Sequence, residues 1–557
     1  MSRVAPARIV VSLVAALALP PVVCAGAVVV ARNGEAKLPI VVPLEATPQE
    51  TTAALELAAY LEKVTAASFA IRAEEKDEIP AIYVGDTSAA RALGIDPAAL
   101  GAEEWVIRTT GGRLVLAGGR PRGTLYAVYH LLEDVVGVRW WTPYDESVPG
   151  KRRLRFRNLA ERGEPAFAYR DVHGIDGPPV FCARSRVNGH FARLSPEYGG
   201  TIGYGPPKQV HTFGLYVDPD EYFEDHPEYF SEIDGERTPV QTQLCLTNED
   251  LRDLVIGKLR AYIEQSRESA RAAGQEAPSL FAISPNDWAR PCQCALCSAV
   301  VERTGAESGV LLDFVNHVAE AIEEEYPEVT IDTLGYYYTF PPPREIRPRD
   351  NVVVRVAGLL ERDFSSSVLD TNNTVYREGV ESWATIAPRM RIWDYTVTFG
   401  KDGDLPLPNL LYLAEDYRYY LDLGVDGLFV QHEHPISADL RDLKLWVLLK
   451  ILEDPRQDTD RLIREFTDGY YGKAGKYVRR YLRLLDEAAG RHDHFIGHRA
   501  TAEDYVYVDA RFALKAAKVF DRAEKAVDHH PVLRRRVRHA RLSLDRATLE
   551  RWDALVG

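Results

Sequence analysis

The chain has 557 residues, of which 46% are hydrophobic and 27% are charged, and this composition excludes a largely disordered or fibrous protein. Sixty-seven Lys and Arg residues against 82 Asp and Glu residues give a net charge of −15. This acidic balance argues against nucleic acid or an anionic membrane as the main partner, although it leaves room for a local basic pocket.

The N-terminal residues have the parts of an export signal. Two arginines precede an apolar run over 9–19, and small residues at 25–27 form a cleavage signature. The run is shorter than the ~20 residues that a membrane-spanning helix needs. We therefore predict a signal peptide over 1–27 and an exported protein, periplasmic or extracellular. The mature form should make no membrane contact unless Cys24 carries a lipid anchor.

Residues 28–160 alternate strand patterns with two helical patterns, which predicts a compact α+β domain. The helices are expected at 51–64 and 123–135. The strands are expected at 28–30, 40–42, 81–84, 105–108, 114–116 and 138–141.

Residues 161–455 contain eight strand-like segments with helical patterns between several of them. The strands are expected at 167–173, 207–213, 240–245, 279–284, 330–336, 351–357, 390–395 and 427–431. Strands that alternate with helices form parallel sheets, and eight such units fit a (β/α)8 TIM-like barrel. Residues 456–557 are amphipathic and lack strand patterns, so we expect a C-terminal helical region.

The predicted strand ends bear carboxylates, aromatic rings, amides and imidazoles. In a (β/α)8 barrel the active site lies at this C-terminal face. Such a mixture suits a sugar, because aromatic faces pack on the ring while polar groups fix its hydroxyls. The predicted substrate-binding residues are Arg170, His173, His211, Asn286, Trp288, Tyr336, Trp393, Tyr395 and His432.

Glycosidic cleavage needs two carboxyl groups that flank one bond. Asp287 is the predicted proton donor, because it ends an apolar strand and Trp288 beside it offers an apolar wall that favours the protonated form. Alternatively, Asp287 only closes a turn or caps a helix. Asp394 and Glu433 compete as the second carboxylate, and Asp171 is a weaker candidate because it adjoins an arginine.

Five cysteines follow the predicted cleavage site. Cys292, Cys294 and Cys297 come just after Asp287, and their spacing suits either a disulfide or a metal clip that Cys245 or a histidine completes. His432 and His434 could also bind zinc, but no third ligand can be identified. We therefore predict neither a cofactor nor a catalytic metal.

Two stretches of the chain resemble known families. Residues 28–150, with Ile82–Asp86, Gly123–Glu133 and Gly137–Trp141, resemble the N-terminal domain of alpha-glucuronidases and beta-hexosaminidases. Residues 165–475 resemble a bacterial family known as domain of unknown function 4838, which is grouped with glycoside-hydrolase barrels. The matching stretches are His226–Phe230, Leu244–Asn248, Ser284–Asp287 with the cysteines that follow, Ile392–Tyr395 and Tyr470–Ala474.

The resemblance implies a sugar-cleaving barrel with its acid after the fourth strand, where Asp287 stands and where relatives commonly have Glu. We therefore expect a glycoside hydrolase that acts on polysaccharide or glycan fragments. The alternatives are a non-catalytic glycan-binding protein on a degenerate barrel and, less favoured, a metal-dependent hydrolase. The sugar, the linkage and the oligomeric state do not follow from the sequence.

Overall fold

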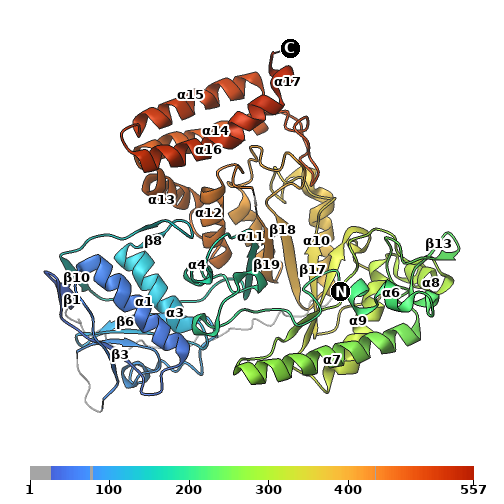
Figure 1. The fold of residues 1–557 in the computed structure, drawn as a ribbon, viewed down its shortest axis with the longest axis horizontal. Coiled ribbons are helices and arrows are strands. Elements are labelled where there is room, and N and C mark those ends of the chain that lie inside the picture. The colour runs from blue at the N-terminus through green and yellow to red at the C-terminus, as the bar shows by residue number, and fades with distance from the viewer. Residues whose placement is uncertain (1–26, 76–79, 433–434, 557) are drawn as a thin grey trace, which may run out of the picture.

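The computed structural model describes residues 27–75, 80–432 and 435–556. Three parts follow one another along the chain in Figure 1: an N-terminal α+β unit, a central parallel sheet with its helices, and a group of C-terminal helices. Nearly all of the predicted signal peptide, together with Cys24, Glu433 and His434, lies outside the described residues. No helix within the described ranges combines the length and the apolar character needed to span a bilayer.

A six-stranded sheet organises the N-terminal unit. Its strands, in spatial order, are β11 (Ala160–Gly163), β6 (Trp105–Thr110), β7 (Arg113–Gly118), β5 (Ile82–Val84), β3 (Ile40–Val42) and β4 (Ile71–Ala73). A small sheet lies beside it and consists of β10 (Arg153–Phe156), β1 (Val28–Arg32) and β2 (Glu35–Ala36). The helices of the unit are α1 (Pro48–Thr65), α2 (Ser88–Arg91) and α3 (Gly123–His130).

Helix α1 shows how the local sequence fixes these elements. Thr47 and Glu50 form a capping box at its start, with the Thr47 hydroxyl accepting a hydrogen bond from the Glu50 backbone. Leu57, Leu61 and Val64 then recur at helical spacing and are buried. Burial of each such side chain contributes roughly 1.5–3 kcal/mol, so this face holds the helix on the sheet.

The central sheet has six parallel strands. In spatial order they are β12 (Tyr169–His173), β19 (Val425–Gln431), β18 (Met390–Tyr395), β17 (Val352–Ala357), β16 (Thr330–Tyr336) and β15 (Leu280–Ala282). The longer helices connected to them are α7 (Glu249–Ala273), α8 (Ala295–Thr304), α9 (Ser308–Glu323), α10 (Thr374–Ile386), α11 (Leu413–Asp422) and α12 (Arg441–Glu453). Shorter elements are α4 (Pro179–Arg184), α5 (Phe213–Tyr216), α6 (Pro219–Tyr222), β8 (Arg139–Trp140), β9 (Glu146–Ser147), β13 (Glu232–Ile233) and β14 (Glu236–Arg237).

The prediction of a complete eight-stranded barrel is wrong, because the described residues form a parallel half-barrel. The segments 207–213 and 240–245 are fully described and neither is a strand. The first is joined to the end of β15 by mixed bonds: the Thr212 hydroxyl donates to the Ala282 carbonyl at 3.0 Å and accepts from the Ser284 backbone at 3.0 Å, and the Thr212 N–H donates to the Ser284 carbonyl at 3.1 Å. Side-chain bonds thus interrupt the regular backbone ladder of a strand.

Buried charges join the N-terminal unit to the central sheet. Arg186 is 1% exposed and pairs with Glu133 at 2.7 Å and with Glu453 at 2.9 Å. Arg170 pairs with Glu103 at 2.7 Å in the same interface. Each pair joins segments that are far apart in the sequence. The N-terminal unit and the central part are therefore held together by buried ion pairs of opposite charge.

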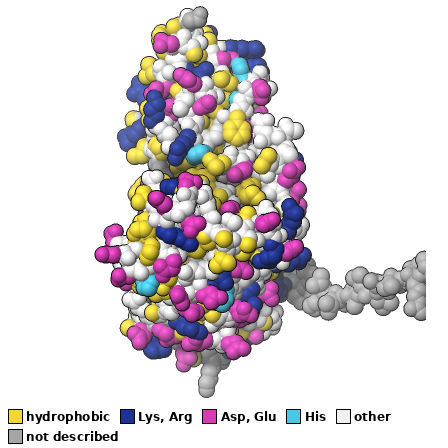
Figure 2. Space-filling model, turned by 90° about the vertical axis from the view of Figure 1, so that its right-hand side faces the viewer, with side chains coloured by type: hydrophobic (Ala, Val, Ile, Leu, Met, Phe, Trp, Pro, Cys, Tyr) yellow, Lys and Arg dark blue, Asp and Glu magenta, His cyan; other side chains and the backbone are white. Residues whose placement is uncertain are grey.

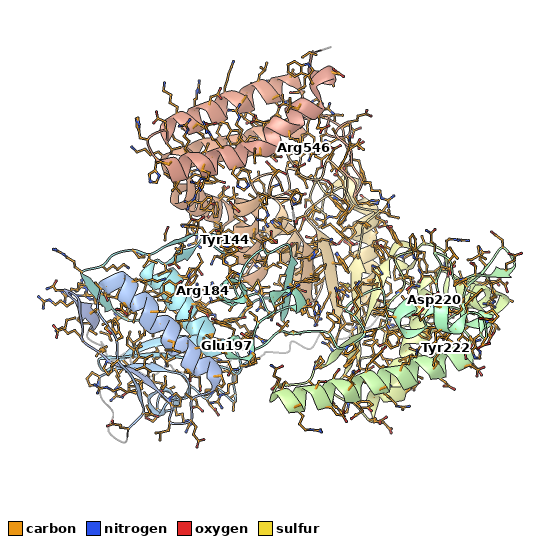
Figure 3. The ribbon with its side chains drawn as sticks, viewed as in Figure 1. Tyr144, Arg184, Glu197, Asp220, Tyr222 and Arg546 are labelled. Carbon is orange, nitrogen blue, oxygen red and sulfur yellow. The ribbon has the colours of Figure 1, made fainter. Side chains whose placement is uncertain are left out.

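Arg184, the last residue of α4, adds a further link at this junction and is labelled beside the N-terminal unit in Figure 3. Its guanidinium lies 2.8 Å from the Glu56 carboxylate of α1 and over the ring of Tyr60 at 5.0 Å. This contact combines an ion pair with a cation–π interaction and fixes α4 against α1.

The C-terminal helices sit above the central sheet in Figure 1. They are α13 (Thr459–Tyr471), α14 (Gly475–Ala489), α15 (Ala510–Ala526), α16 (Pro531–Glu550) and α17 (Trp552–Val556). Arg546, labelled in Figure 3, reaches from α16 to the Asp402 carboxylate at 3.1 Å. The segment 490–509 between α14 and α15 returns to the sheet, where the Phe399 N–H donates to the His498 carbonyl at 2.6 Å.

The surface carries charges of both signs. On the face in Figure 2, Lys and Arg side chains are interspersed with Asp and Glu side chains over the described residues. This face therefore offers no extended basic surface of the kind that binds a nucleic acid backbone.

Candidate active site

Strand pleating decides which side chains reach the interior of the half-barrel. Successive residues of a strand point to opposite faces, so Trp393 and Tyr395 of β18 share the inner face with Tyr336 of β16. These rings line a cavity of about 300 Å³, which we call the Tyr336 cavity. Its apolar and aromatic wall consists of Leu334, Tyr336, Tyr337, Ala357, Leu359, Trp393, Tyr395 and Phe399.

Asp287 stands at the mouth of the Tyr336 cavity with 59% of its side chain exposed. The Tyr336 hydroxyl donates a hydrogen bond to Asp287 Oδ1 at 3.0 Å. Burial raises the pKa of Tyr336 well above its ordinary value, so its hydroxyl keeps the proton at neutral pH. A hydroxyl can donate to a carboxylate and can turn to accept from a carboxylic acid, so this contact serves both protonation states.

His211 faces the same carboxyl group. Its Nε2 lies 4.0 Å from Asp287 Oδ1, while its Nδ1 lies 2.8 Å from the Pro285 carbonyl and must carry the proton it donates there. Burial lowers the pKa of His211, so the neutral ring with a bare Nε2 is the form expected at pH 7. Asp287, Tyr336 and His211 thus bring an acid, a hydroxyl and an acceptor nitrogen to one opening.

Asp394 does not join this group, which corrects its predicted place opposite Asp287. Because it lies between Trp393 and Tyr395, the pleat turns it to the outer face of the sheet, where it is 0% exposed. There it pairs with Arg362 and accepts a hydrogen bond from Tyr417 of α11 at 2.9 Å. These contacts hold α11 against the sheet, so Asp394 has a structural role.

Arg170 and Asn286 are also committed to structure. Arg170 points outward from β12 and pairs with Glu103. The Asn286 amide accepts from the Gly214 backbone at 2.9 Å and donates to the Thr242 carbonyl at 3.1 Å. Both side chains were predicted to bind substrate, and both instead tie segments of the chain together.

Two other residues that were predicted to bind substrate are not among the described residues that line the Tyr336 cavity. Trp288 is 45% exposed next to Asp287. His432 is buried, with its Nδ1 3.2 Å from the Thr396 hydroxyl. Glu433, the other predicted carboxylate, lies outside the described residues.

A second cavity of about 330 Å³, which we call the Asp171 cavity, adjoins the first. Trp393 and Gln431 line both, and the Trp393 indole N–H donates to Gln431 Oε1 at 3.2 Å. His173, a predicted substrate contact, lines the Asp171 cavity and packs against Phe191 with ring centroids 4.6 Å apart.

Asp171 itself is 1% exposed, and burial raises its pKa to about 6. It accepts hydrogen bonds from the Phe191 backbone at 2.8 Å and from the Tyr169 hydroxyl at 2.9 Å. Arg355 also lines this cavity, although it is paired with Asp332 at 2.7 Å. Asp171 is therefore a carboxyl group that changes charge close to neutral pH.

Several residues that line the Tyr336 cavity were not predicted from the sequence. Tyr337 directly follows β16 and Gln431 ends β19, so their positions beside Tyr336 and His432 were the available signal. His498 and Arg499 come from the segment between α14 and α15. Nothing in the local sequence of that helical region indicates that it returns to the mouth of the cavity.

One group of candidate metal ligands occurs among the described residues. It comprises four cysteines, Cys245, Cys292, Cys294 and Cys297, and not the side chains of the two cavities. The last three of these cysteines follow Asp287 by five to ten residues in the chain.

Comparison with protein families finds one match in each of the first two parts of the chain. The sequence model of a domain of unknown function (DUF4838) matches residues 140–483, and that of the glycosyl hydrolase family 67 N-terminus matches residues 30–131. These matches confirm the two resemblances seen in the sequence. No curated protein matches the chain.

Two of the solved structures that align with the chain do so at low identity. A family GH115 4-O-methyl-alpha-glucuronidase with specificity for decorated arabinogalactans aligns with a TM-score of 0.54 and 13% identity, over 93% of this chain and 72% of that one. A mutant Streptomyces plicatus beta-hexosaminidase aligns with a TM-score of 0.42 and 12% identity, over 81% of this chain and 92% of that one. At such identities the first comparison establishes the shared architecture alone.

Proposed function

Since the chain belongs to the DUF4838 family and has a fold shared with a glycoside hydrolase, we propose that it is an exported glycoside hydrolase that cleaves glycosidic bonds in polysaccharide or glycan fragments. The observation that carries this proposal is the Tyr336 cavity. It lies at the carboxyl ends of parallel strands, has the volume of a small-molecule site, and combines an aromatic wall with an accessible carboxyl group.

Asp287 is proposed as the acid/base residue. As an acid it gives its proton to the glycosidic oxygen while the bond from that oxygen to the anomeric carbon breaks. Water then supplies the hydroxyl at the anomeric carbon, and its remaining proton passes to the carboxylate that acts as the base. The Tyr336 hydroxyl orients the carboxyl group in both protonation states. The bare Nε2 of His211 is available to a sugar hydroxyl at the same opening.

The second carboxyl group is proposed from the sequence. Glu433 follows Gln431, an inward-facing residue of the last strand, by two positions. In such folds the reactive groups follow the carboxyl ends of the strands, which favours Glu433 as the nucleophile or base. Asp171, with its pKa near 6, is the competing group because its cavity shares the Trp393–Gln431 wall.

A leaving-group experiment tests these roles. The variants Asp287→Asn, Glu433→Gln and Asp171→Asn are assayed on aryl glycosides with good and poor leaving groups, and on uronic-acid oligosaccharides. Loss of an acid should cost about 10²–10⁴-fold with poor leaving groups and far less with good ones, which need no proton. Loss of the nucleophile or base should lower both rates. Asp220→Asn, at the exposed site labelled in Figure 3, is the matched control.

A second candidate function is glycan binding without cleavage. It is favoured by one observation: Asp287 is the single carboxylate among the described residues that line the Tyr336 cavity. In that case the wild-type protein binds oligosaccharide but does not hydrolyse it. Trp393→Ala then weakens binding, and Asp287→Asn is as inactive as the wild type. Measurable wild-type hydrolysis that Asp287→Asn abolishes excludes this alternative, and near-full activity of Asp287→Asn refutes the proposed role of Asp287.

A further inference from the structure

Four of the described cysteines meet at one point. Cys245, Cys292, Cys294 and Cys297 are buried, and their sulfur atoms all lie within 4.8 Å of one another. We call this group the four-cysteine cluster. It joins two segments that are separated by helix α7, with Cys245 before the helix and the other three after β15.

The spacing of the sulfur atoms fits a tetrahedral metal site. With zinc–sulfur bonds of about 2.3 Å, two sulfur atoms on a tetrahedron are about 3.8 Å apart. The Cys245 and Cys294 sulfur atoms are 3.6 Å apart, close to that edge length. A disulfide instead requires about 2.05 Å and joins its sulfur atoms in pairs, whereas here all four gather around a common centre.

The surroundings of the cluster suit thiolate ligands. The Glu232 N–H donates to the Cys292 sulfur at 3.3 Å, and the Thr247 hydroxyl lies 3.2 Å from the Cys297 sulfur. Hydrogen bonds of this kind orient metal ligands and disperse their charge. The Arg237 guanidinium, 3.6 Å from the Cys292 sulfur, supplies a positive charge next to a centre where four thiolates and one divalent ion leave an excess of two negative charges.

We propose that Cys245, Cys292, Cys294 and Cys297 bind one zinc ion as a closed structural site. Four protein ligands leave no open position, so the ion takes no part in hydrolysis. The site resolves the alternatives of disulfide and metal clip in favour of the metal. It is independent of the proposed function, because it rests on the sulfur geometry alone.

The location of the cluster gives the ion a specific task. Gln243, two residues before Cys245, accepts a hydrogen bond from the Asn286 backbone N–H at 2.8 Å and donates to the Asn286 carbonyl at 2.9 Å. The same two segments are therefore joined twice, by the Gln243 amide at Asn286 and by the cysteines just beyond it. Zinc would hold the Asp287 loop where α7 and the short helix α8 begin.

Elemental analysis of the full chain, purified without added metal or reductant, tests the proposal. We expect one zinc per chain, released to a chromogenic chelator when the protein is denatured. Replacement by cobalt should produce thiolate-to-cobalt charge-transfer absorption, and all four cysteines should be alkylated without prior reduction. Protein that lacks zinc and yields disulfide-linked peptides from these cysteines overturns the proposal, as does iron in place of zinc.

Single-cysteine variants locate the ion. Cys245→Ser and Cys297→Ser should lose the zinc and melt at a lower temperature, whereas Cys182→Ser is the matched control because Cys182 is buried but lies outside the cluster. Retention of one zinc per chain by both cluster variants refutes the assignment. If either variant fails to fold, the zinc content and alkylation pattern of the wild-type chain still decide the question.

Discussion

Replacement of Asp171 by Asn should change how stability depends on pH. The folded pKa of Asp171 is about 6, against an ordinary value of 3.8, because burial disfavours the charged form. Between these two values the folded chain binds more protons than the unfolded chain. Wild-type stability is therefore lost as pH rises through this window, and Asn, which never ionises, does not share the loss.

The size of the effect follows from the two pKa values. The raised pKa of Asp171 destabilises the folded state by about 1 kcal/mol at pH 4.5 and by about 3 kcal/mol at pH 7.5, since each pKa unit corresponds to about 1.36 kcal/mol. Asp171 is 1% exposed, so solvent does little to screen this cost. Between these pH values the wild type should lose about 2 kcal/mol relative to Asp171→Asn, whatever constant offset the substitution itself introduces.

Urea denaturation of both proteins at pH 4.5, 6 and 7.5, followed by fluorescence, measures this difference. Asp220→Asn, at an exposed position, should run parallel to the wild type. A wild-type-minus-variant difference that stays constant across the three pH values, or that changes with the opposite sign, would refute the assignment of a buried, neutral carboxylic acid to Asp171.

Three further predictions concern the site and its support. Tyr336→Phe removes the hydrogen bond to Asp287 and should lower kcat/KM by about 10–100-fold, as expected for about 1.5–3 kcal/mol, while near-wild-type kinetics would contradict the orienting role. Arg499→Gln removes a cation from the cavity lining and should raise KM for uronic-acid substrates but not for neutral ones; equal effects on both would count against it. Arg362→Ala leaves Asp394 buried without its cation and should cost about 3–5 kcal/mol in denaturant unfolding, and a loss below about 1 kcal/mol would show that the pair matters little.

Strand placement was largely readable from the sequence because most strands of the central sheet are short, buried runs rich in apolar and aromatic residues. The segments 207–213 and 240–245 instead join their neighbours through isolated backbone bonds and through the side chains of their own Thr212 and Gln243. A one-dimensional pattern does not distinguish a backbone ladder from a few well-placed side-chain bonds.

The candidate site was readable only in part. The prediction placed Trp393, Asp394 and Tyr395 in one pocket, although the pleat of a strand forbids three consecutive residues from sharing a face. The rings of Trp393 and Tyr395 occupy the inner face, so the carboxylate between them points to the outer face. Side-chain alternation along the strand could therefore have excluded Asp394 from the predicted site. By contrast, His498 and Arg499 reach the cavity from about a hundred residues beyond Tyr395, and no local pattern encodes such a contact.

The buried arginines between the first two parts of the chain restrict how this protein can diverge or be re-engineered. Arg186 serves two carboxylates, one on each side of the junction, so loss of any one of these three residues leaves the buried charges unbalanced. Substitutions there should be tolerated only as coordinated exchanges of both signs. Chimaeras that graft a foreign N-terminal unit onto this sheet should misassemble unless the whole set of charges, Glu103 included, is transplanted with it.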